Sequence, residues 1–255
     1  MDRLHAVVRG EGPETIVLIH GFGGCGAMWE PVAGRLADRT RLISYDLPGH
    51  GGSLAFPGAG SAKAAATVIL ADLAARGIET AHFSGHSMGG AVATLAAITD
   101  PGRVASLTLL APGGFGPEIN GRLLARYAVA RESAEIVRCL EGMFGFASPI
   151  PDETVRILAA MRAAPGQCEA LSDIATRIAK DGRQGVIPRE LVAALTMPVA
   201  VAWGDLDGVL PPRHADGLPA RFAVHAIAGA GHMLVEEAGE RVAALVAETA
   251  GIAGS

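Results

Sequence analysis

Ser87 has the surroundings expected of a nucleophilic serine. It lies in Gly85-His86-Ser87-Met88-Gly89, which fits the pattern G-x-S-x-G. An apolar stretch at residues 81–84 precedes the motif, and a run of small residues that favours a helix follows it. A strand, a sharp turn and a helix make up a nucleophile elbow, in which the flanking glycines leave room for a strained serine backbone. The pattern therefore predicts a nucleophile at Ser87, and an ordinary helix N-cap serine is the alternative.

Two loops late in the chain carry the groups that such a serine needs. A hydroxyl at neutral pH requires a base, and the base requires a carboxylate that orients it. His232 follows the last predicted strand, and Asp205 and Asp207 follow the strand before it. These groups are expected at the same sheet edge as Ser87, where α/β sheets bind their ligands. Spacing alone does not separate the two aspartates, and Glu118 is a more distant contender for the acid.

Backbone amides near the serine are candidates for an oxyanion hole. The Met88 amide lies at the predicted start of a helix, where free N–H groups favour negative charge. If Ser87 is the nucleophile, we expect the loop after His20 to lie beside the elbow, with the Phe22 amide as the second donor. Phe22 and Met88 are therefore the predicted oxyanion donors.

The same loop permits a second interpretation, as a dinucleotide-binding loop. Residues 21–26 fit G-x-G-x-x-G, and Asp46 stands 20 residues beyond them at the end of the next predicted strand. That pattern is typical of a loop that holds a pyrophosphate, with the acid on a ribose hydroxyl. His20 at the start of the loop and Pro31 early in the following helix argue against it. It also leaves the serine, aspartate and histidine unexplained.

Composition excludes several classes of protein. Half of the 255 residues are hydrophobic and 18% are charged, which excludes a disordered chain. The net charge of −5 and the absence of a Lys/Arg run give no footprint for nucleic acid. Cys25, Cys139 and Cys168 form no metal or disulfide pattern, and we expect free buried thiols in a reducing compartment. His82 and His86 are four residues apart, but they lie on a predicted strand and turn rather than on a helix, so they are not zinc ligands of the H-E-x-x-H kind and no metal is expected.

The elements that would position these residues alternate between strands and helices. Strands are predicted at residues 4–9, 14–20, 41–46, 80–85, 104–111, 198–203 and 222–227. Helices are predicted at residues 28–37, within 61–76, at 88–99 and at 236–249. This alternation predicts the α/β class, with a mostly parallel sheet flanked by helices. The N-terminus has no apolar stretch of signal-peptide length, and no apolar run in the sequence reaches the length of a membrane span, so a soluble cytoplasmic protein is expected.

A long helical insertion interrupts this alternation. Helices are predicted at residues 120–131, 133–142, 152–164 and 168–180, with no convincing strand among them. We therefore expect a core formed by residues 1–112 and 190–255, and a lid formed by residues 113–189. The lid supplies candidate substrate-binding residues, Met143, Phe144 and Phe146, which suggest an apolar pocket. Simple packing of these residues against the core is the alternative.

Taken together, the motifs resemble the α/β-hydrolase superfamily over residues 16–235. They comprise His20-Gly21-Phe22-Gly23, Asp46-Leu47-Pro48-Gly49-His50-Gly51, the serine motif with Gly90, the loop around Asp207, and Gly229-Ala230-Gly231-His232. The resemblance implies the α/β-hydrolase fold and a Ser87–His232–Asp207 triad. It favours Asp207 over Asp205, because a G-x-x-D followed four residues on by proline matches the acid loop of the family. It implies no metal or organic cofactor.

A narrower likeness lies at the start of the insertion. Residues 110–121, Leu-Ala-Pro-Gly-Gly-Phe-Gly-Pro-Glu-Ile-Asn-Gly, resemble the hydrolase-like C-terminal domain of acetyltransferase (E2) subunits of acetoin dehydrogenase complexes. Those subunits carry an N-terminal lipoyl domain, whereas this sequence begins at its first predicted hairpin. The chain is also similar to carboxylesterases, enol-lactonases and carbon–carbon bond hydrolases. It departs from the last group, because no proline follows Gly23 as in H-G-x-G-P-G.

The predicted function is hydrolysis of a carboxylic ester, or a related acyl bond, of a small to medium apolar substrate through an acyl-enzyme. The expected partner is a small-molecule acyl substrate, with neither nucleic acid nor membrane. Acyl transfer, carbon–carbon bond hydrolysis, enol-lactone hydrolysis and a ligand-binding receptor are the alternatives. The oligomeric state stays open.

Overall fold

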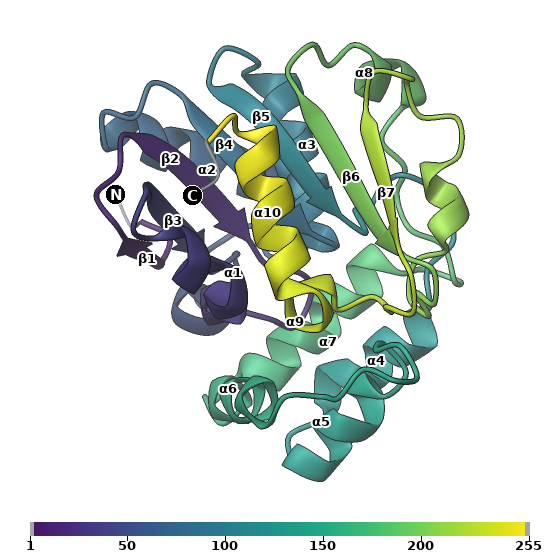
Figure 1. Ribbon diagram of the computed structural model, residues 1–255. Helices are drawn as coiled ribbons and strands as arrows, with labels where there is room; N and C mark the ends of the chain where they lie inside the picture. The colour runs from purple at the N-terminus through teal and green to yellow at the C-terminus, as the bar shows by residue number, and fades with distance from the viewer. Residues whose placement is uncertain (1–2, 253–255) are drawn as a thin grey trace.

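A seven-stranded sheet forms the centre of the molecule (Figure 1). The structure is a computed structural model that describes residues 3–252, so the outermost residues of the predicted core lie outside it. The strand order is β1-β3-β2-β4-β5-β6-β7; β1 runs antiparallel to β3, and all other neighbours run parallel. The strands are β1 (Ala6–Arg9), β2 (Glu14–Ile19), β3 (Thr40–Tyr45), β4 (Ala81–His86), β5 (Val104–Leu110), β6 (Val199–Gly204) and β7 (Ala223–Ile227). The predicted mostly parallel sheet is confirmed.

Helices cover both faces of the sheet (Figure 1). One face carries α1 (Glu30–Leu36) and α10 (Gly239–Thr249), and the other carries α2 (Ala62–Ala75) and α3 (Met88–Thr99). The apolar run of β2 fits this arrangement, because successive side chains of a strand point to opposite faces. Leu18 packs with the α1 and α10 side, and its neighbours Val17 and Ile19 pack with the α2 and α3 side. A strand buried on both faces therefore needs no polar alternation.

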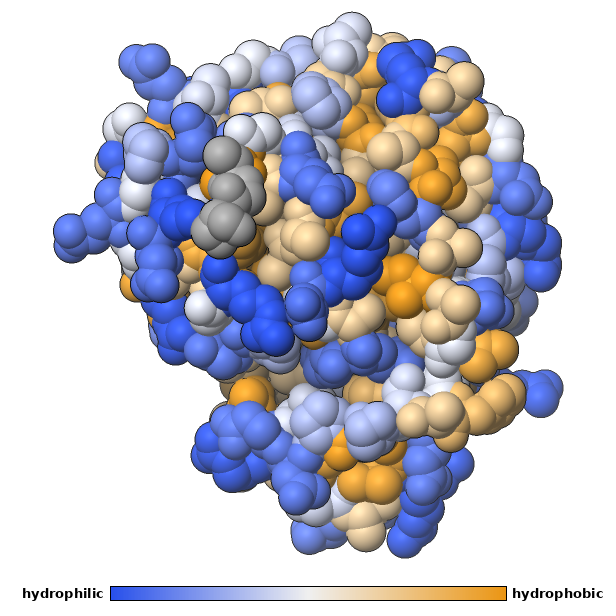
Figure 2. Space-filling model, viewed as in Figure 1, coloured by the Kyte–Doolittle hydropathy of each residue, from blue (hydrophilic) through white to orange (hydrophobic). Residues whose placement is uncertain are grey.

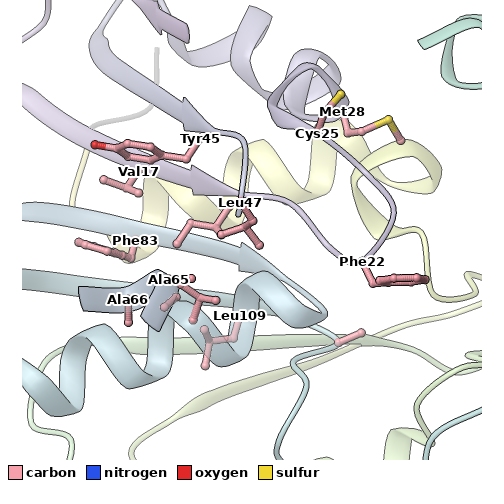
Figure 3. Close-up of a cluster of buried hydrophobic side chains, with 14 of the residues drawn as sticks. Val17, Phe22, Cys25, Met28, Tyr45, Leu47, Ala65, Ala66, Phe83 and Leu109 are labelled. Carbon is pink, nitrogen blue, oxygen red and sulfur yellow. The ribbon is translucent and has the colours of Figure 1, made fainter. Parts of the chain in front are cut away.

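Part of the larger apolar cluster lies between the sheet and α2 (Figure 3). Its labelled side chains include one from each of β2, β3, β4 and β5, and the small Ala65 and Ala66 from α2. These small side chains let the helix approach the sheet closely. Phe22 lies apart from these side chains, on the loop that leaves β2. The sheet thus fixes where that loop begins.

The helical insertion between β5 and β6 lies at the carboxyl ends of the strands (Figure 1). It contains α4 (Gly121–Val129), α5 (Ser133–Leu140), α6 (Asp152–Arg162), α7 (Gln167–Ile178) and the short α8 (Arg189–Ala193). Figure 2 shows it as a lobe beneath the core, with hydrophilic and hydrophobic residues mixed on the visible surface. The four predicted helical stretches are present, and the five-residue α8 was not predicted. That the insertion acts as a lid stays a prediction.

Two predicted helices are broken. The stretch 28–37 is a 3₁₀ turn, Gly26–Trp29, followed by α1, with Pro31 near the start of α1. The predicted final helix, 236–249, is in fact α9 (Leu234–Glu237) and α10, separated at Ala238. The break keeps Glu237 beside the loop before α9, whose amides its carboxylate binds. Within residues 3–252, no helix has both the length and the apolar character needed to cross a membrane.

Candidate active site

Ser87 occupies a strained turn between β4 and α3. Its φ of 52° and ψ of −116° are unusual for a residue with a side chain. A Cβ on Gly85 would lie 2.3 Å from the Gly89 carbonyl oxygen, and one on Gly89 would lie 2.2 Å from the Ile19 carbonyl oxygen. The flanking glycines are therefore required, as the motif predicted. Ser87 precedes α3 without a side-chain capping bond, so the N-cap interpretation is not supported.

His232 and Asp207 form a buried hydrogen-bonded pair. The distance from His232 Nδ1 to Asp207 Oδ2 is 2.7 Å, and Trp203 Nε1 donates to the same oxygen at 3.0 Å. Asp207 Oδ1 accepts from the amides of Val209 and Leu210 at 2.8 and 2.9 Å. Burial opposes ionisation of Asp207, but His232 and these amides outweigh it and lower its pKa. Asp207 is thus an ionised carboxylate at neutral pH that holds Nδ1 of the histidine.

The two competing acids lie elsewhere. Asp205 accepts a hydrogen bond from the Gly229 amide at 2.7 Å and supports the loop after β7. Glu118 lies 2.7 Å from His214 Nε2 and accepts from Arg213 at 3.0 Å. These contacts engage both carboxylates away from His232.

His86, which the sequence analysis left without a catalytic role, positions His232. Its Nε2 lies 2.8 Å from the His232 carbonyl oxygen. Burial and the neighbouring His232 lower the pKa of His86 to about 3, so the ring is neutral and Nε2–H donates. The His232 amide in turn donates to the Met143 carbonyl oxygen at 2.6 Å. The backbone of His232 is therefore fixed by both the elbow and the helical insertion.

Glu237 is a second positioning residue that sequence reasoning missed. Its Oε2 accepts from the amides of Gly231 and Gly145 at 2.9 and 2.7 Å, and its Oε1 accepts from the Met233 amide at 3.0 Å. It therefore joins the histidine loop to the insertion. The only sequence signal was an acidic residue five positions after His232, which is too common to be informative.

The loop after β2 is held by two neutral histidines. His20 Nε2 accepts from the Leu47 amide at 2.9 Å, and His50 Nε2 accepts from the Gly23 amide at 3.1 Å. Burial lowers the pKa of both histidines, so each ring is neutral and its Nε2 keeps the lone pair that accepts the amide. Each ring therefore joins the loop after β2 to the loop after β3. The Asp46 carboxylate accepts hydrogen bonds from the amides of Gly26 and Gly52 at 2.7 and 2.8 Å. It is thus engaged in holding these loops, which does not support the ribose-binding role of the dinucleotide interpretation.

This loop places the Phe22 amide near the elbow. A Cβ on Gly21 would lie 3.2 Å from Cβ of Ser87, so the two backbones are close. Neither the Phe22 nor the Met88 amide donates to a protein acceptor within residues 3–252. Two unpaired donors beside a strained serine are what stabilisation of an oxyanion requires.

Two cavities meet at Ser87. The smaller, about 30 Å³ and partly open to solvent, is lined by Ser87 and His232. The larger, about 390 Å³, is lined by Ser87 and Met88 and by apolar residues such as Ile178 and Ile187. In the part of the chain that the structure describes, no direct hydrogen bond joins the Ser87 hydroxyl to His232. Bonds of this kind tighten when substrate is bound.

The three lid candidates lie in different places. Met143 lines the smaller cavity. Phe144 is buried and belongs to the apolar core rather than to the lining of either cavity. Phe146 is 95% exposed and lines neither cavity. The positions of Phe144 and Phe146 give no support to a role in substrate binding.

No metal site competes with this interpretation in the described part of the chain. Among residues 3–252, no group of three or more His, Cys, Asp and Glu side chains could hold a metal ion. The three cysteines are buried and free, and burial raises the pKa of Cys25 to about 11. Burial also raises the pKa of Cys139, so neither Cys25 nor Cys139 is a reactive thiolate at neutral pH.

Comparison with known proteins gives matches over most of the chain. The Alpha/beta hydrolase family matches residues 16–245. The dihydrolipoyllysine-residue acetyltransferase component of the acetoin cleaving system of Cupriavidus necator is 34% identical over 238 residues, or 91% of this chain and 62% of that protein. The chain thus spans less than two thirds of that relative.

A second relative is matched over most of its length. The pimeloyl-[acyl-carrier protein] methyl ester esterase of Aliivibrio salmonicida is 30% identical over 228 residues, covering 85% of this chain and 83% of that protein. Among solved structures, a meta-cleavage product hydrolase from Pseudomonas fluorescens has a TM-score of 0.80 at 24% identity, covering 96% of this chain and 92% of that one. The likeness to this solved structure is one of fold alone.

Proposed function

Because the chain belongs to the alpha/beta hydrolase family, we propose that it is a serine hydrolase that cleaves a carboxylic ester through an acyl-enzyme. Ser87 is the nucleophile, His232 the base and Asp207 the orienting acid. The observation that carries the proposal is the 2.7 Å bond between His232 and Asp207, in a histidine that lines one cavity with the strained Ser87. The esterase relative supports an ester as the bond that is cleaved.

The chemistry follows from the position of each group. His232 Nε2 takes the proton from the Ser87 hydroxyl as its oxygen attacks the ester carbon, and Asp207 stabilises the imidazolium that forms. The Phe22 and Met88 amides donate to the oxyanion. Collapse of the tetrahedral intermediate expels the alcohol, which receives its proton from His232. Water, deprotonated by His232, then attacks the acyl-enzyme and releases the acid and Ser87.

The larger cavity supports an apolar acyl group. Its lining includes Ala91, Leu95, Ile119, Leu124, Ile178, Val186, Ile187 and Leu210. Apolar cavities of this size bind small to medium hydrocarbon chains, because burial removes the chain from water. A cytoplasmic location and a small-molecule substrate remain part of the proposal.

The test is hydrolysis of p-nitrophenyl esters from acetate to octanoate by wild type, Ser87→Ala and Ser133→Ala. Ser133 is an exposed serine at the start of α5 and serves as the matched control. We expect Ser87→Ala to reduce kcat by about 10⁶-fold and Ser133→Ala to leave it unchanged. Retention of more than a small fraction of activity in Ser87→Ala would exclude this serine as the nucleophile.

Acyl transfer is a second candidate, favoured by the 34% identity to an acetyltransferase component. The acyl-enzyme would form in the same way, and a thiol or an alcohol would replace water as the acceptor. Partition of the acyl group between water and coenzyme A or dihydrolipoamide separates the two. A thioester as main product would favour transfer, and free acid at every thiol concentration would favour hydrolysis.

A further inference from the structure

Two of the residues that line the smaller cavity have polar side chains that the proposed chemistry does not use. Glu236 and Trp29 line it together with Ser87 and His232. Glu236 lies on α9 and Trp29 on the 3₁₀ turn Gly26–Trp29, and these two elements pack against each other. The two polar side chains therefore come from neighbouring elements that line the same cavity.

Both side chains have a buried atom without a partner. Within residues 3–252, neither Glu236 Oε2 nor Trp29 Nε1 has a hydrogen-bond partner, although both atoms are shielded from solvent. The adjacent Glu237 differs, since both of its oxygens accept from backbone amides. An unpaired buried polar atom destabilises the fold, so two of them on side chains that line one cavity call for a ligand group.

The chemistry of the two atoms defines that group. An indole N–H can only donate a hydrogen bond, so its partner must be an acceptor. Burial, with the negative charge of Glu237, raises the pKa of Glu236 to about 8, and the carboxyl is mainly protonated at neutral pH. A neutral carboxyl both donates and accepts. A hydroxyl group fits both, whereas an ammonium group cannot accept from the indole.

The position of His232 indicates which part of the substrate carries the group. His232 lines the smaller cavity and not the larger one. In the proposed mechanism it protonates the departing alcohol, so the alcohol part of the ester lies on the His232 side. The acyl chain then takes the larger, apolar cavity.

We propose that Glu236 and Trp29 form a polar subsite that binds a hydroxyl group on the alcohol part of the ester substrate. The substrate class is thus an ester of a hydroxylated alcohol with an apolar acid. This inference rests on the proposed function for the reaction, and on the two unpaired buried atoms for the specificity.

The test compares esters that differ only by a hydroxyl in place of a methyl group. The pairs are 2-hydroxyethyl butyrate with propyl butyrate, and 3-hydroxypropyl butyrate with butyl butyrate. The readout is the ratio of kcat/KM within each pair. We expect wild type to prefer the hydroxylated ester of at least one pair by about 10-fold or more, because a plain alkyl group leaves both polar atoms unpaired.

The variants separate recognition from general damage. Glu236→Leu should lower the ratio by about 10- to 100-fold, and Trp29→Phe should lower it by a smaller factor. Glu236→Gln keeps a donor and an acceptor, so it should retain part of the preference and also serves if Glu236→Leu fails to fold. Glu240→Gln, an exposed glutamate on α10, is the control and should leave the ratio unchanged. Equal ratios in wild type and the Glu236 variants would overturn the subsite.

A crystal structure of Ser87→Ala soaked with 2-hydroxyethyl butyrate gives a readout independent of turnover. The hydroxyl should lie about 3 Å from a Glu236 carboxyl oxygen or from Trp29 Nε1. A bound ester with its hydroxyl elsewhere, or water alone at these atoms, would overturn the subsite even if esters are hydrolysed. Binding in this position without turnover by wild type would contradict the proposed ester hydrolysis and not the subsite.

Discussion

Asp205 and Asp207 lie two positions apart in the sequence but have different hydrogen-bond partners. Asp207 turns inward, where amides of its own loop and the ring of His232 meet its carboxylate. Asp205 is exposed and accepts a hydrogen bond from the Gly229 amide. Burial would raise the pKa of Asp207, and the partners of its carboxylate more than compensate. At the residue scale, hydrogen-bond partners rather than position in the sequence decide which acid orients the histidine.

Replacement of each aspartate by asparagine tests this difference. Asp207→Asn should reduce kcat by about 10⁴-fold, because an amide can no longer fix the tautomer of His232 or stabilise its cation. Asp205→Asn keeps an oxygen for the Gly229 amide and should leave kcat within about threefold of wild type. Steady-state kinetics on one p-nitrophenyl ester measures both. An equal loss in the two variants would contradict the assignment of the acid.

At the scale of elements, the sharp turn at Ser87 exists because α3 begins directly after β4 has ended. The backbone of α3 passes so close to the end of β2 that Gly89 has no room for a side chain. This contact places the Met88 amide beside the loop that carries Phe22. Gly34 in α1 is also a helical glycine, but only a flexible Glu30 oxygen, 3.8 Å away, approaches its Cβ position.

The two helical glycines therefore predict opposite effects on stability. Gly89→Ala should lower the free energy of unfolding by about 2–3 kcal/mol, because the added Cβ would clash with backbone that cannot move freely. Gly34→Ala should raise it by about 0.5–1 kcal/mol through better helix propensity. Urea unfolding followed by circular dichroism measures both changes. A stabilised Gly89→Ala would mean that the helix and β2 are less closely packed than described.

On the scale of the whole molecule, the insertion is attached to the core at several separate points. Glu237 binds Gly145, and the His232 amide binds the Met143 carbonyl oxygen. At the entry to the insertion, Glu118 pairs with Arg213 and His214 of the segment after β6. These contacts join the insertion to both loops that carry the acid and the base.

The Glu118 contact should make stability depend on pH. His214, followed by Arg213, lowers the pKa of Glu118 to about 2, below its ordinary value of 4.5. A depressed acid pKa stabilises the fold above the unfolded value, and the effect is lost as the pH falls from 4.5 toward 2. Glu118→Gln should thus lower Tm at pH 7, and the difference from wild type should shrink toward zero at pH 2–3.

Glu153→Gln is the matched control for this experiment. Glu153 also has a lowered pKa, from Arg156, but both residues lie within α6 and the pair joins no separate elements. Its substitution should change Tm much less at pH 7. A Glu118→Gln difference that stayed constant from pH 7 to pH 2 would rule out the ionised pair as its source.

The sequence by itself determined the features that depend on contiguous residues. The strained turn at Ser87 follows from the Gly-x-Ser-x-Gly segment, because adjacent residues set the φ and ψ of a turn. The order of strands and helices along the chain follows from apolar periodicity, and with it the α/β class. The placement of Asp207 and His232 after the last two strands followed in the same way.

Only the tertiary structure decided the features that depend on side-chain direction and on distant contacts. It placed Phe146 in solvent, broke the final helix at Ala238 and gave His86 and Glu237 positioning contacts. Among residues 3–252, it also left Oε2 of Glu236, a residue that lines a cavity with Ser87, without a hydrogen-bond partner. Neighbouring residues in the sequence do not predict these features. The partners of a side chain can lie up to 146 residues away, as for His86 and His232, and they are fixed only when the sheet and the insertion pack together.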